Sequence, residues 1–280
     1  MENVVLDIGN YYFKYNGASL GYFSSKINTK FEANAESYER VEYDEKIALI
    51  GSGELDREYS KADKEGLTHQ ILYAITKATV AESINLCLLL PINQITKKQI
   101  FIDRFENKIY EFKVNGIKKR IKINKFAVLP EGQCSYYSLK NKSKYQLIIE
   151  IGSRTVNWVA YECGKLVKSG TEKIGVFDLY KTIKEIENSK GEDYTEEDIE
   201  HQIRRGRVVV SDETYKKFLK DILNRIKANI NIKNYDTCFA GGGAEDLKNI
   251  IRKIPNVTIH PAAFYSNVLG AEEVIKRMWK

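Results

Sequence analysis

The chain has 280 residues, 43% hydrophobic and 29% charged, a composition typical of a soluble globular protein with one large domain or two small ones. Its four cysteines are widely spaced without a C-x-x-C pair, which argues against a zinc site, and its longest apolar stretch is far too short to span a membrane. The net charge of +6 comes without a stripe of aromatic and basic residues, so we expect no direct binding of nucleic acid. No signal peptide is recognisable, and we expect a cytoplasmic protein.

The first half begins as a β-meander over residues 1–30, with Gly17 and Gly21 in its turns. Residues 31–65 are polar and mixed. Apolar spacing then predicts a helix over 67–83 and a buried strand over 85–90. Residues 101–114 and 117–123 alternate as two strands around Asn115-Gly116, which predicts a hairpin. A short strand at 126–129 leads into Pro130-Glu131-Gly132.

The second half repeats this plan from Tyr145 and adds a helical insertion at about 177–233. One helix is predicted at 177–186, Thr195 opens a second with a capping box, and Ser211 caps a third. A strand at 236–240 ends in three glycines. A helix from about 244 to 254, a short strand at 257–259 and a closing helix at 267–278 follow.

The most informative feature is a turn signature that occurs twice. An apolar run, an acid, a hydrophobic residue, a glycine and a small polar residue occur at 4–10 and again at 147–153. Gly21 follows Asp7 at the same distance as Gly164 follows Glu150. Such strand-turn units offer backbone N–H groups to a phosphate and a carboxylate to its metal. The repeat predicts one nucleotide bound between two related halves.

In the first turn, we expect Asp7 to hold a hydrated Mg²⁺, Gly9 to let the backbone approach a phosphate, and Asn10 to donate to it. Lys14 on the next strand can neutralise phosphate charge. The alternatives are an ordinary strand-turn and a solvent-facing lysine.

In the second turn, Glu150 corresponds to Asp7, and Gly152, Ser153 and Thr155 suit a phosphate cradle. Arg154 is either a phosphate ligand or a surface charge, and the sequence leaves both open.

Two further segments can contribute to the site. Glu131, which ends a strand, can orient or deprotonate an attacking water, unless it is an exposed turn acid. The turn of Gly241, Gly242 and Gly243 lies between a strand and a helix, where glycines permit close approach to a ribose or phosphate. A flexible connection is the alternative.

The order of these segments resembles that of the actin-like ATPase superfamily, which includes actin, the heat-shock chaperone ATPases and the sugar kinases. The Glu-Ile-Gly-Ser-Arg-Thr turn, the Gly-Gly-Gly-Ala turn and the Asn-Val-Leu-Gly segment near the end are most similar to the ParM (StbA) class of plasmid-segregation proteins. The resemblance implies an α/β, actin-like fold of two related halves around a nucleotide cleft. The first domain would comprise 1–146 plus 266–280 and the second 147–265.

The resemblance also implies an ATPase that assembles into nucleotide-dependent filaments with ATP or GTP and Mg²⁺, and a DNA-binding adaptor on a plasmid centromere as partner. Asp7, Glu131 and Glu150 would be the catalytic acids, with Asp7 and Glu150 reaching the metal through water. Arg204 and Arg205 are candidates for stacking on the adenine, although a simple surface position is the alternative.

The sequence departs from the family pattern at Glu150, where the family has Asp, and the chain is compact for the class. Two alternative functions therefore stay open. One is a small-molecule kinase of the same superfamily, because type III pantothenate kinases also begin with Asp-x-Gly-Asn. The other is a nucleotide-binding scaffold with impaired hydrolysis, which Glu150 suggests.

Overall fold

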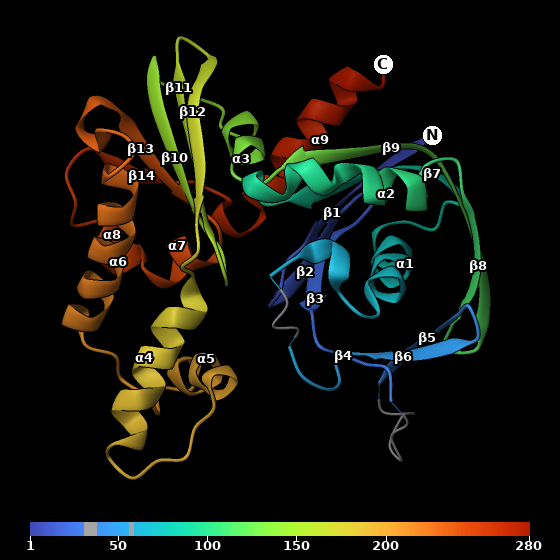
Figure 1. The fold of residues 1–280 in the computed structure, drawn as a ribbon, viewed down its shortest axis with the longest axis horizontal. Helices are drawn as coiled ribbons and strands as arrows, with labels where there is room; N and C mark the ends of the chain where they lie inside the picture. The colour runs from blue at the N-terminus through green and yellow to red at the C-terminus, as the bar shows by residue number, and fades with distance from the viewer. Residues whose placement is uncertain (31–37, 56–58) are drawn as a thin grey trace. The chain divides into compact units, whose positions relative to one another are not determined.

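The computed structural model describes residues 1–30, 38–55 and 59–280 (Figure 1). The chain forms two compact units, and each is described by itself. Unit 1 comprises Met1–Lys140 and Tyr265–Lys280, and unit 2 comprises Asn141–Phe264.

Unit 1 is built on a mixed sheet whose strand order is β3-β2-β1-β7-β9-β8-β5-β6-β4 within the described residues. The strands β1, β7 and β9 are parallel, and each of the other neighbouring pairs is antiparallel. The bounds are β1 (Glu2–Ile8), β2 (Tyr12–Asn16), β3 (Leu20–Ser24), β4 (Ile27–Asn28), β5 (Glu39–Tyr43), β6 (Lys46–Ile50), β7 (Ser83–Leu90), β8 (Ile109–Val114) and β9 (Ile117–Pro130).

The two faces of this sheet carry separate cores, because successive side chains of a strand point to opposite faces. Val4, Leu6 and Ile8 pack with α1 (Leu67–Ala78) and α2 (Lys98–Phe105). Val5 packs on the other face, in a core that includes α9 (Ser266–Met278) and Cys134 of α3 (Gln133–Tyr137). Figure 1 shows the outer strands curving around α1. Because both faces of the sheet are covered by these cores, a functional site in unit 1 is expected at the ends of the central strands.

Unit 2 repeats the core of unit 1. Its strand order, β12-β11-β10-β13-β14, has the same directions as β3-β2-β1-β7-β9: two antiparallel neighbours, then two parallel ones. The bounds are β10 (Tyr145–Ile151), β11 (Val156–Glu162), β12 (Lys165–Glu172), β13 (Asp236–Ala240), β14 (Val257–Ile259), α4 (Val176–Asn188), α5 (Glu196–Arg204), α6 (Asp212–Lys227), α7 (Gly242–Asp246) and α8 (Lys248–Ile251). The repeat that the two turn motifs predict is therefore also a repeat of topology.

Short 3-10 helices complete the described elements. They are η2 (Lys61–Asp63), η3 (Ile92–Lys97), η4 (Ile232–Asn234) and η5 (Ala263–Tyr265).

The predicted helix caps of the insertion are confirmed. The Thr195 side chain accepts from the backbone N–H of Asp198, whose carboxylate in turn accepts from the N–H of Thr195, which completes a capping box. The Ser211 side chain caps α6 by accepting from the backbone N–H of Thr214. These signals place the starts of α5 and α6 correctly.

Three element predictions for unit 1 are wrong. Residues 101–105 are the end of helix α2 rather than a strand, because Phe101 and Phe105, four residues apart, are both fully buried on one helix face. The helix predicted over 67–83 stops at Ala78, where the backbone of Thr79 becomes extended. Gly21 lies inside strand β3 and not in a turn.

Two further predictions differ from the structure. The helix predicted over 244–254 is divided at Leu247 into α7 and α8. In the mixed region 31–65, the structure has the hairpin β5–β6, whose turn residues Asp44 and Glu45 both have positive φ. Without glycine or asparagine at these positions, the hairpin lacks its usual signal. Residues 31–37 and 56–58 of that region lie outside the described ranges.

In the part of the chain that the structure describes, no helix has both the length and the apolar character needed to cross a lipid bilayer.

Candidate functional site

The first turn starts where β1 ends, and its acid is paired. Asp7 is only 5% exposed, and its carboxylate lies 3.2 Å from the ammonium of Lys14, which faces it from β2. The side chain of Lys14 is buried as well. These positions exclude a solvent-facing lysine and place a cation next to the acid.

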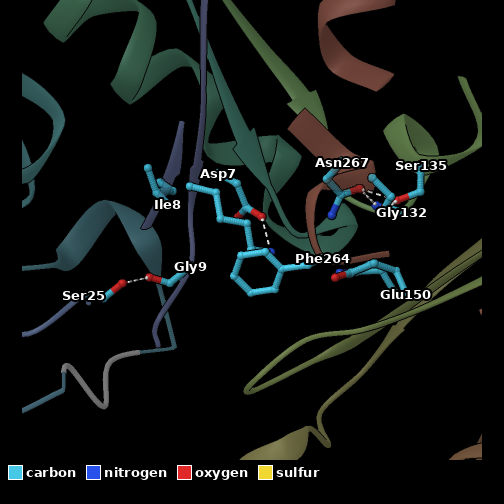
Figure 2. A network of polar contacts seen from close by, with 12 residues as sticks. Asp7, Ile8, Gly9, Ser25, Gly132, Ser135, Glu150, Phe264 and Asn267 are labelled. Atoms are coloured by element: carbon cyan, nitrogen blue, oxygen red, sulfur yellow. Dashed lines mark hydrogen bonds and ion pairs between the residues drawn. The ribbon is translucent and has the colours of Figure 1, made fainter. Parts of the chain in front are cut away.

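The turn itself requires glycine at position 9. A Cβ on Gly9 would lie 2.3 Å from the carbonyl oxygen of Tyr12, so the loop could not close with a side chain there. The carbonyl of Gly9 accepts a hydrogen bond of 2.7 Å from the hydroxyl of Ser25 (Figure 2). Asn10, which follows, is 3% exposed. The close packing fixes the turn in one conformation.

Two lysines from a distant segment also support the first turn, and sequence reasoning missed both. Lys61 donates to the carbonyl of Ile8 at 2.6 Å and to the side-chain oxygen of Asn10 at 3.0 Å. Lys64 reaches the carbonyl of Gly9 at 3.5 Å. Both lysines are nearly fully buried. Their position in a polar, lysine-containing stretch carries no local signal of burial.

In the second turn, the acid is held by an amide instead of a cation. Glu150 is 4% exposed, and Asn157 on β11 donates to its carboxylate at 3.0 Å. The Asn157 oxygen accepts from the hydroxyl of Thr171 at 2.8 Å, which fixes the orientation of the amide.

The backbone of the second turn is held by helix α4. The N–H groups of Val176 and Phe177, at the start of the helix, donate to the carbonyls of Gly152 and Ser153 at 3.0 Å each. The N–H of Gly152 itself donates to the carbonyl of Thr155 at 2.9 Å, which closes the turn.

Arg154 lies over a ring of the same unit. Its guanidinium carbon is 4.2 Å from the centroid of the Phe177 ring, a cation–π contact. The residue is half-buried. This contact places Arg154 against α4, next to Ser153 and Thr155 of the turn.

The two turns correspond residue by residue along the strands that leave them. Asp7 pairs with Lys14 in the sheet, and Glu150 pairs with Asn157, so each acid faces a residue seven positions later.

The residue pairs between the second and third strands of each unit show that Gly164 is not the counterpart of Gly21 that equal spacing had predicted. Gly21 pairs with Tyr15, and Gly170 pairs with Trp158, so Gly170 is the counterpart of Gly21. Gly164 lies in the turn of the second hairpin, whose strands β11 and β12 are longer than β2 and β3, and has a φ of +78°.

Glu131 directly follows the end of β9, and its backbone is fixed. Its N–H donates to the carbonyl of Leu90 at the end of β7 at 2.8 Å, and the residue is 7% exposed, which excludes an exposed turn acid. Because β1, β7 and β9 are parallel neighbours, Asp7 and Glu131 both lie at the carboxyl ends of the central strands.

The segment after Glu131 is tied to the predicted closing helix. The side-chain oxygen of Asn267 accepts from the N–H of Gly132 at 2.9 Å and from the hydroxyl of Ser135 at 2.8 Å (Figure 2). In the same contact, a Cβ on Gly270 would lie 1.7 Å from the carbonyl oxygen of Cys134. The Asn-Val-Leu-Gly segment therefore helps to position the loop that carries Glu131.

The buried thiol of Cys134 is affected by the charges of Glu131 and Asp7. Burial, with Cys87 and then the charges of Glu131 and Asp7, raises the pKa of the Cys134 thiol well above its usual value. Cys134 is therefore a neutral thiol that lies near both carboxylates, and it is not a nucleophile at neutral pH.

Of the three glycines after β13, two are needed for packing against β10, and the third is more exposed. A Cβ on Gly241 would lie 2.4 Å from the carbonyl oxygen of Ile151 and 2.8 Å from the Glu150 carboxylate, and one on Gly243 would meet Ile151 at 2.3 Å. These two glycines let the turn pack against β10. Gly242 meets only the Phe264 ring, at 3.4 Å, and is the least buried of the three.

Arg204 and Arg205 lie at the exposed end of α5. The side chain of Arg204 is 62% exposed and pairs with Glu200 one turn earlier. Burial, and then the charge of Glu200, raises the pKa of Asp246 at the end of α7 to about 7, and the charge of Arg204 acts in the opposite direction. Arg205 is the C-terminal cap of its helix.

Candidate metal ligands are sparse. Among the residues that the structure describes, no three or more His, Cys, Asp or Glu residues cluster to hold a metal directly. Asp7 and Glu150 each offer carboxylate oxygens next to a phosphate-type turn. Each carboxylate, taken by itself, is the kind of ligand that suits Mg²⁺, which keeps most of its waters and takes one or two carboxylates.

Three solved proteins illustrate the similarity of the whole chain. Ta0583, an archaeal actin homolog, superposes with a TM-score of 0.84 at 18% identity over 99% of this chain and 100% of its own. The chain has an actin-like fold. A ParM in a 15-stranded filament from Clostridium botulinum (TM-score 0.79, 17% identity, 99% and 100% covered) and AlfA in a filament from B. subtilis plasmid pLS32 (0.64, 21%, 97% and 98%) share this fold.

The resemblance to the ParM class that the motifs predict is thus confirmed at the level of the actin-like fold. Ta0583 has also been solved in complex with ADP, and an AlfA filament bound to AMPPNP. No protein-family model matches this sequence, and no curated protein matches it. The motifs therefore identify a fold that overall sequence similarity does not.

Proposed function

We propose that this chain binds one Mg²⁺-nucleotide through both turns, hydrolyses it, and assembles into filaments whose lifetime the nucleotide controls. The observation that carries the proposal is the repeat: each unit places a buried acid and a glycine turn at the end of its central strand. Two such turns on one actin-like chain fit a ligand with several phosphates.

Each turn supplies groups suited to phosphate oxygens. Gly9 and Gly152 allow close backbone approach, Asn10, Ser153 and Thr155 can donate hydrogen bonds, and Lys14 adds positive charge. Asp7 and Glu150 would hold the hydrated metal, which neutralises phosphate charge when bound. Gly242 and the Arg204 side chain are the groups that we assign to the nucleoside, with Gly241 and Gly243 shaping the turn around it.

Glu131 is the residue that we assign to the attacking water. Its backbone is fixed at the end of β9 by Leu90 and, through Gly132, by Asn267, so the residue stands at the same edge of the sheet as Asp7. A carboxylate in this position can orient a water and accept its proton as the bond to the terminal phosphate breaks.

Filament formation would require a contact between two different surfaces of the chain. Such a contact generates a helical polymer when its rotation does not close a ring. Binding of nucleotide by both turns would set the arrangement that favours this contact, and loss of the terminal phosphate would weaken it. By analogy with the plasmid proteins of this fold, we propose plasmid segregation with a DNA-binding adaptor as the cellular role.

The central test is assembly under defined nucleotides. Micromolar protein is incubated with Mg²⁺ and ATP, GTP, AMPPNP or ADP, then pelleted and viewed by electron microscopy. We expect filaments with a triphosphate or the analogue that do not persist with ADP. We also expect nucleotide affinity to fall in EDTA; equal affinity with and without Mg²⁺ would contradict the assignment of Asp7 and Glu150.

Glu131 is tested separately. Glu131→Gln keeps the shape of the side chain but removes the base, so we expect unchanged nucleotide affinity and a fall in phosphate release of about 10²-fold or more. Glu111→Gln, at an exposed acid of β8 in the same unit, is the matched control and should behave as the parent. Unchanged phosphate release in Glu131→Gln would show that another group positions the water.

The same assays address the alternatives. A kinase would stay unassembled in every nucleotide and transfer phosphate to a small alcohol such as pantothenate. A scaffold with impaired hydrolysis would assemble with ATP but release no phosphate.

A further inference from the structure

The segment 59–64 contacts the first turn from a part of the sequence that no motif marks. Lys61 opens the short helix η2, and its ammonium lies between two oxygens of the turn, the Ile8 carbonyl and the Asn10 side-chain oxygen. Both Lys61 and Asn10 are nearly fully buried, at 6% and 3% exposure. The contact is therefore internal and well defined.

The chemistry of an ammonium group decides which way the Asn10 amide points. An ammonium has three donors and no acceptor, whereas a side-chain amide has an oxygen that accepts and a nitrogen that donates. Lys61 can therefore bond only the oxygen of Asn10. The NH₂ group of Asn10 then takes the opposite end of the amide, where it can donate to a phosphate oxygen.

Lys61 is itself held in place from the other side. Its backbone N–H donates to the Gln94 side-chain oxygen at 2.9 Å, and the Gln94 nitrogen donates to the carbonyl of Tyr59 at 2.7 Å. Gln94 is 5% exposed and belongs to η3, which follows β7. A continuous set of hydrogen bonds thus runs from η3 through Lys61 to Asn10.

We propose that Lys61 is a positioning residue that fixes the Asn10 amide with its NH₂ group toward the nucleotide phosphates. The inference rests on the proposed function, because it assumes that the first turn binds phosphate. It assigns Lys61 no contact with the nucleotide. Removing Lys61 would let the amide rotate, so part of the Asn10 population would present an oxygen to the phosphate and repel it.

The test compares Lys61→Met, Asn10→Ala and the double variant by their affinity for ATP and for adenosine. We expect each single variant to bind ATP about tenfold more weakly with unchanged affinity for adenosine, and the double variant to be no worse than Asn10→Ala alone. Lys97→Met is the matched control. Lys97 bonds Ser60 and Asp63 of the same segment at the surface, so it should bind ATP as the parent does.

Asn10→Asp tests the same idea with Lys61 kept. A carboxylate there would pair with Lys61, so the melting temperature should be maintained, but no amide donor would remain and ATP affinity should fall more than tenfold while adenosine affinity holds. If Asn10→Asp bound ATP as tightly as the parent, or if the losses of Lys61→Met and Asn10→Ala multiplied in the double variant, the inference would be overturned. A parent protein that binds no nucleotide would instead refute the proposed function.

Discussion

The two phosphate-type turns share a backbone plan but differ in what holds them. In the first turn, the carbonyls of Ile8 and Gly9 accept from side chains, namely Lys61 and Ser25. In the second turn, the carbonyl of Gly152, which is the counterpart of Gly9, and the next carbonyl, that of Ser153, accept from backbone N–H groups at the start of α4. The hydrogen bonds to the first turn need particular side chains as donors. Those to the second turn come from the backbone and need only that the helix begins at this place.

The two turns also differ in the charged groups that surround them. The first turn has three buried lysines: Lys14 pairs with the carboxylate of Asp7, and Lys61 and Lys64 bond carbonyls of the turn. In the second turn, the carboxylate of Glu150 is bonded to the neutral amide of Asn157, and the partial positive charge of a helix N-terminus lies at the turn. The two copies of the motif thus differ in electrostatic support, and single substitutions should affect the first turn more than the second.

The largest contrast should come from the groups that face the two acids. Lys14→Met leaves Asp7 buried without its cation and should cost about 3–5 kcal/mol of unfolding free energy. Asn157→Leu removes a neutral donor from Glu150 and should cost about 1–3 kcal/mol. Urea unfolding measures both costs. Single-tryptophan backgrounds allow each unit to be followed separately, because Trp158 lies in unit 2 and Trp279 in unit 1.

The control for this contrast is Asp7→Leu combined with Lys14→Met. Because both charges are then absent, the double variant should recover a large part of the stability lost by Lys14→Met alone. Equal costs for Lys14→Met and Asn157→Leu would mean that the two turns do not differ in electrostatic support.

The paired glycines give the next contrast. A Cβ on Gly170 would lie 2.6 Å from the indole of Trp158, which is 2% exposed and bonded to Glu172. Since Trp158 has no room to move, Gly170→Ala should cost about 1–3 kcal/mol. At Gly21, the clash is with the hydroxyl end of the half-buried Tyr15, which can shift, so Gly21→Ala should cost less.

Thermal unfolding of these two variants measures the difference. Gly116→Ala, at a glycine with open space around it but positive φ, separates the strain of the backbone from crowding. A larger loss at Gly21 than at Gly170 would contradict the expected order.

Exchange of the two acids tests the chemistry of the turns. Glu150→Asp shortens the second acid to the form that the family has, and we expect unchanged nucleotide binding with phosphate release raised several-fold. The reciprocal Asp7→Glu should lower phosphate release, because the longer side chain displaces the carboxylate from Lys14. Changes below tenfold correspond to less than about 1.4 kcal/mol of barrier. A rate for Glu150→Asp at or below the parent's would mean that the pocket is adapted to glutamate.

The smallest effect should come from the buried histidines, one in each unit. Burial lowers the pKa of His69 and of His260, so below pH of about 6.5 the unfolded state binds more protons than the folded state. Stability should therefore be full above that pH and fall as the pH drops, by about 1 kcal/mol or less per histidine. Melting temperatures at pH 7.5 and 5.5 measure this.

His260→Gln should reduce the pH dependence of unit 2 and His69→Gln that of unit 1. A melting temperature that rises on acidification would show that other groups dominate the pH dependence.

The sequence predicted the parts of the site that are local. The acid, the glycine and the small polar residue of each turn lie within four positions, and both turns fold as these signals indicate. The caps of α5 and α6 are local as well. Glu131 was placed correctly because a proline and a glycine mark the end of its strand.

The missed features depend on contacts that are distant in sequence. Lys61 bonds Asn10 from 51 positions away, and its neighbours contain nothing that distinguishes a buried lysine from an exposed one. The counterpart of Gly21 was misplaced because the second hairpin is longer, so equal spacing pointed to Gly164 instead of Gly170. The strand predicted at 101–105 was wrong for a local reason: its apolar residues do not alternate, and the four-residue spacing of Phe101 and Phe105, which are both buried, is that of one helix face.

The strand β9 has a mechanical consequence. Its 14 residues run from the hairpin beside β5 to Pro130, directly before Glu131, a length of about 45 Å at about 3.3 Å per residue. The strand is bonded first to β8 and then to β7, with an irregular register between Ile123 and Phe126, so it resists stretching but can bend at that point. A load or a bound partner at the Asn115-Gly116 tip would be transmitted to Glu131 along this strand, which would couple the outer edge of unit 1 to the residue assigned to hydrolysis.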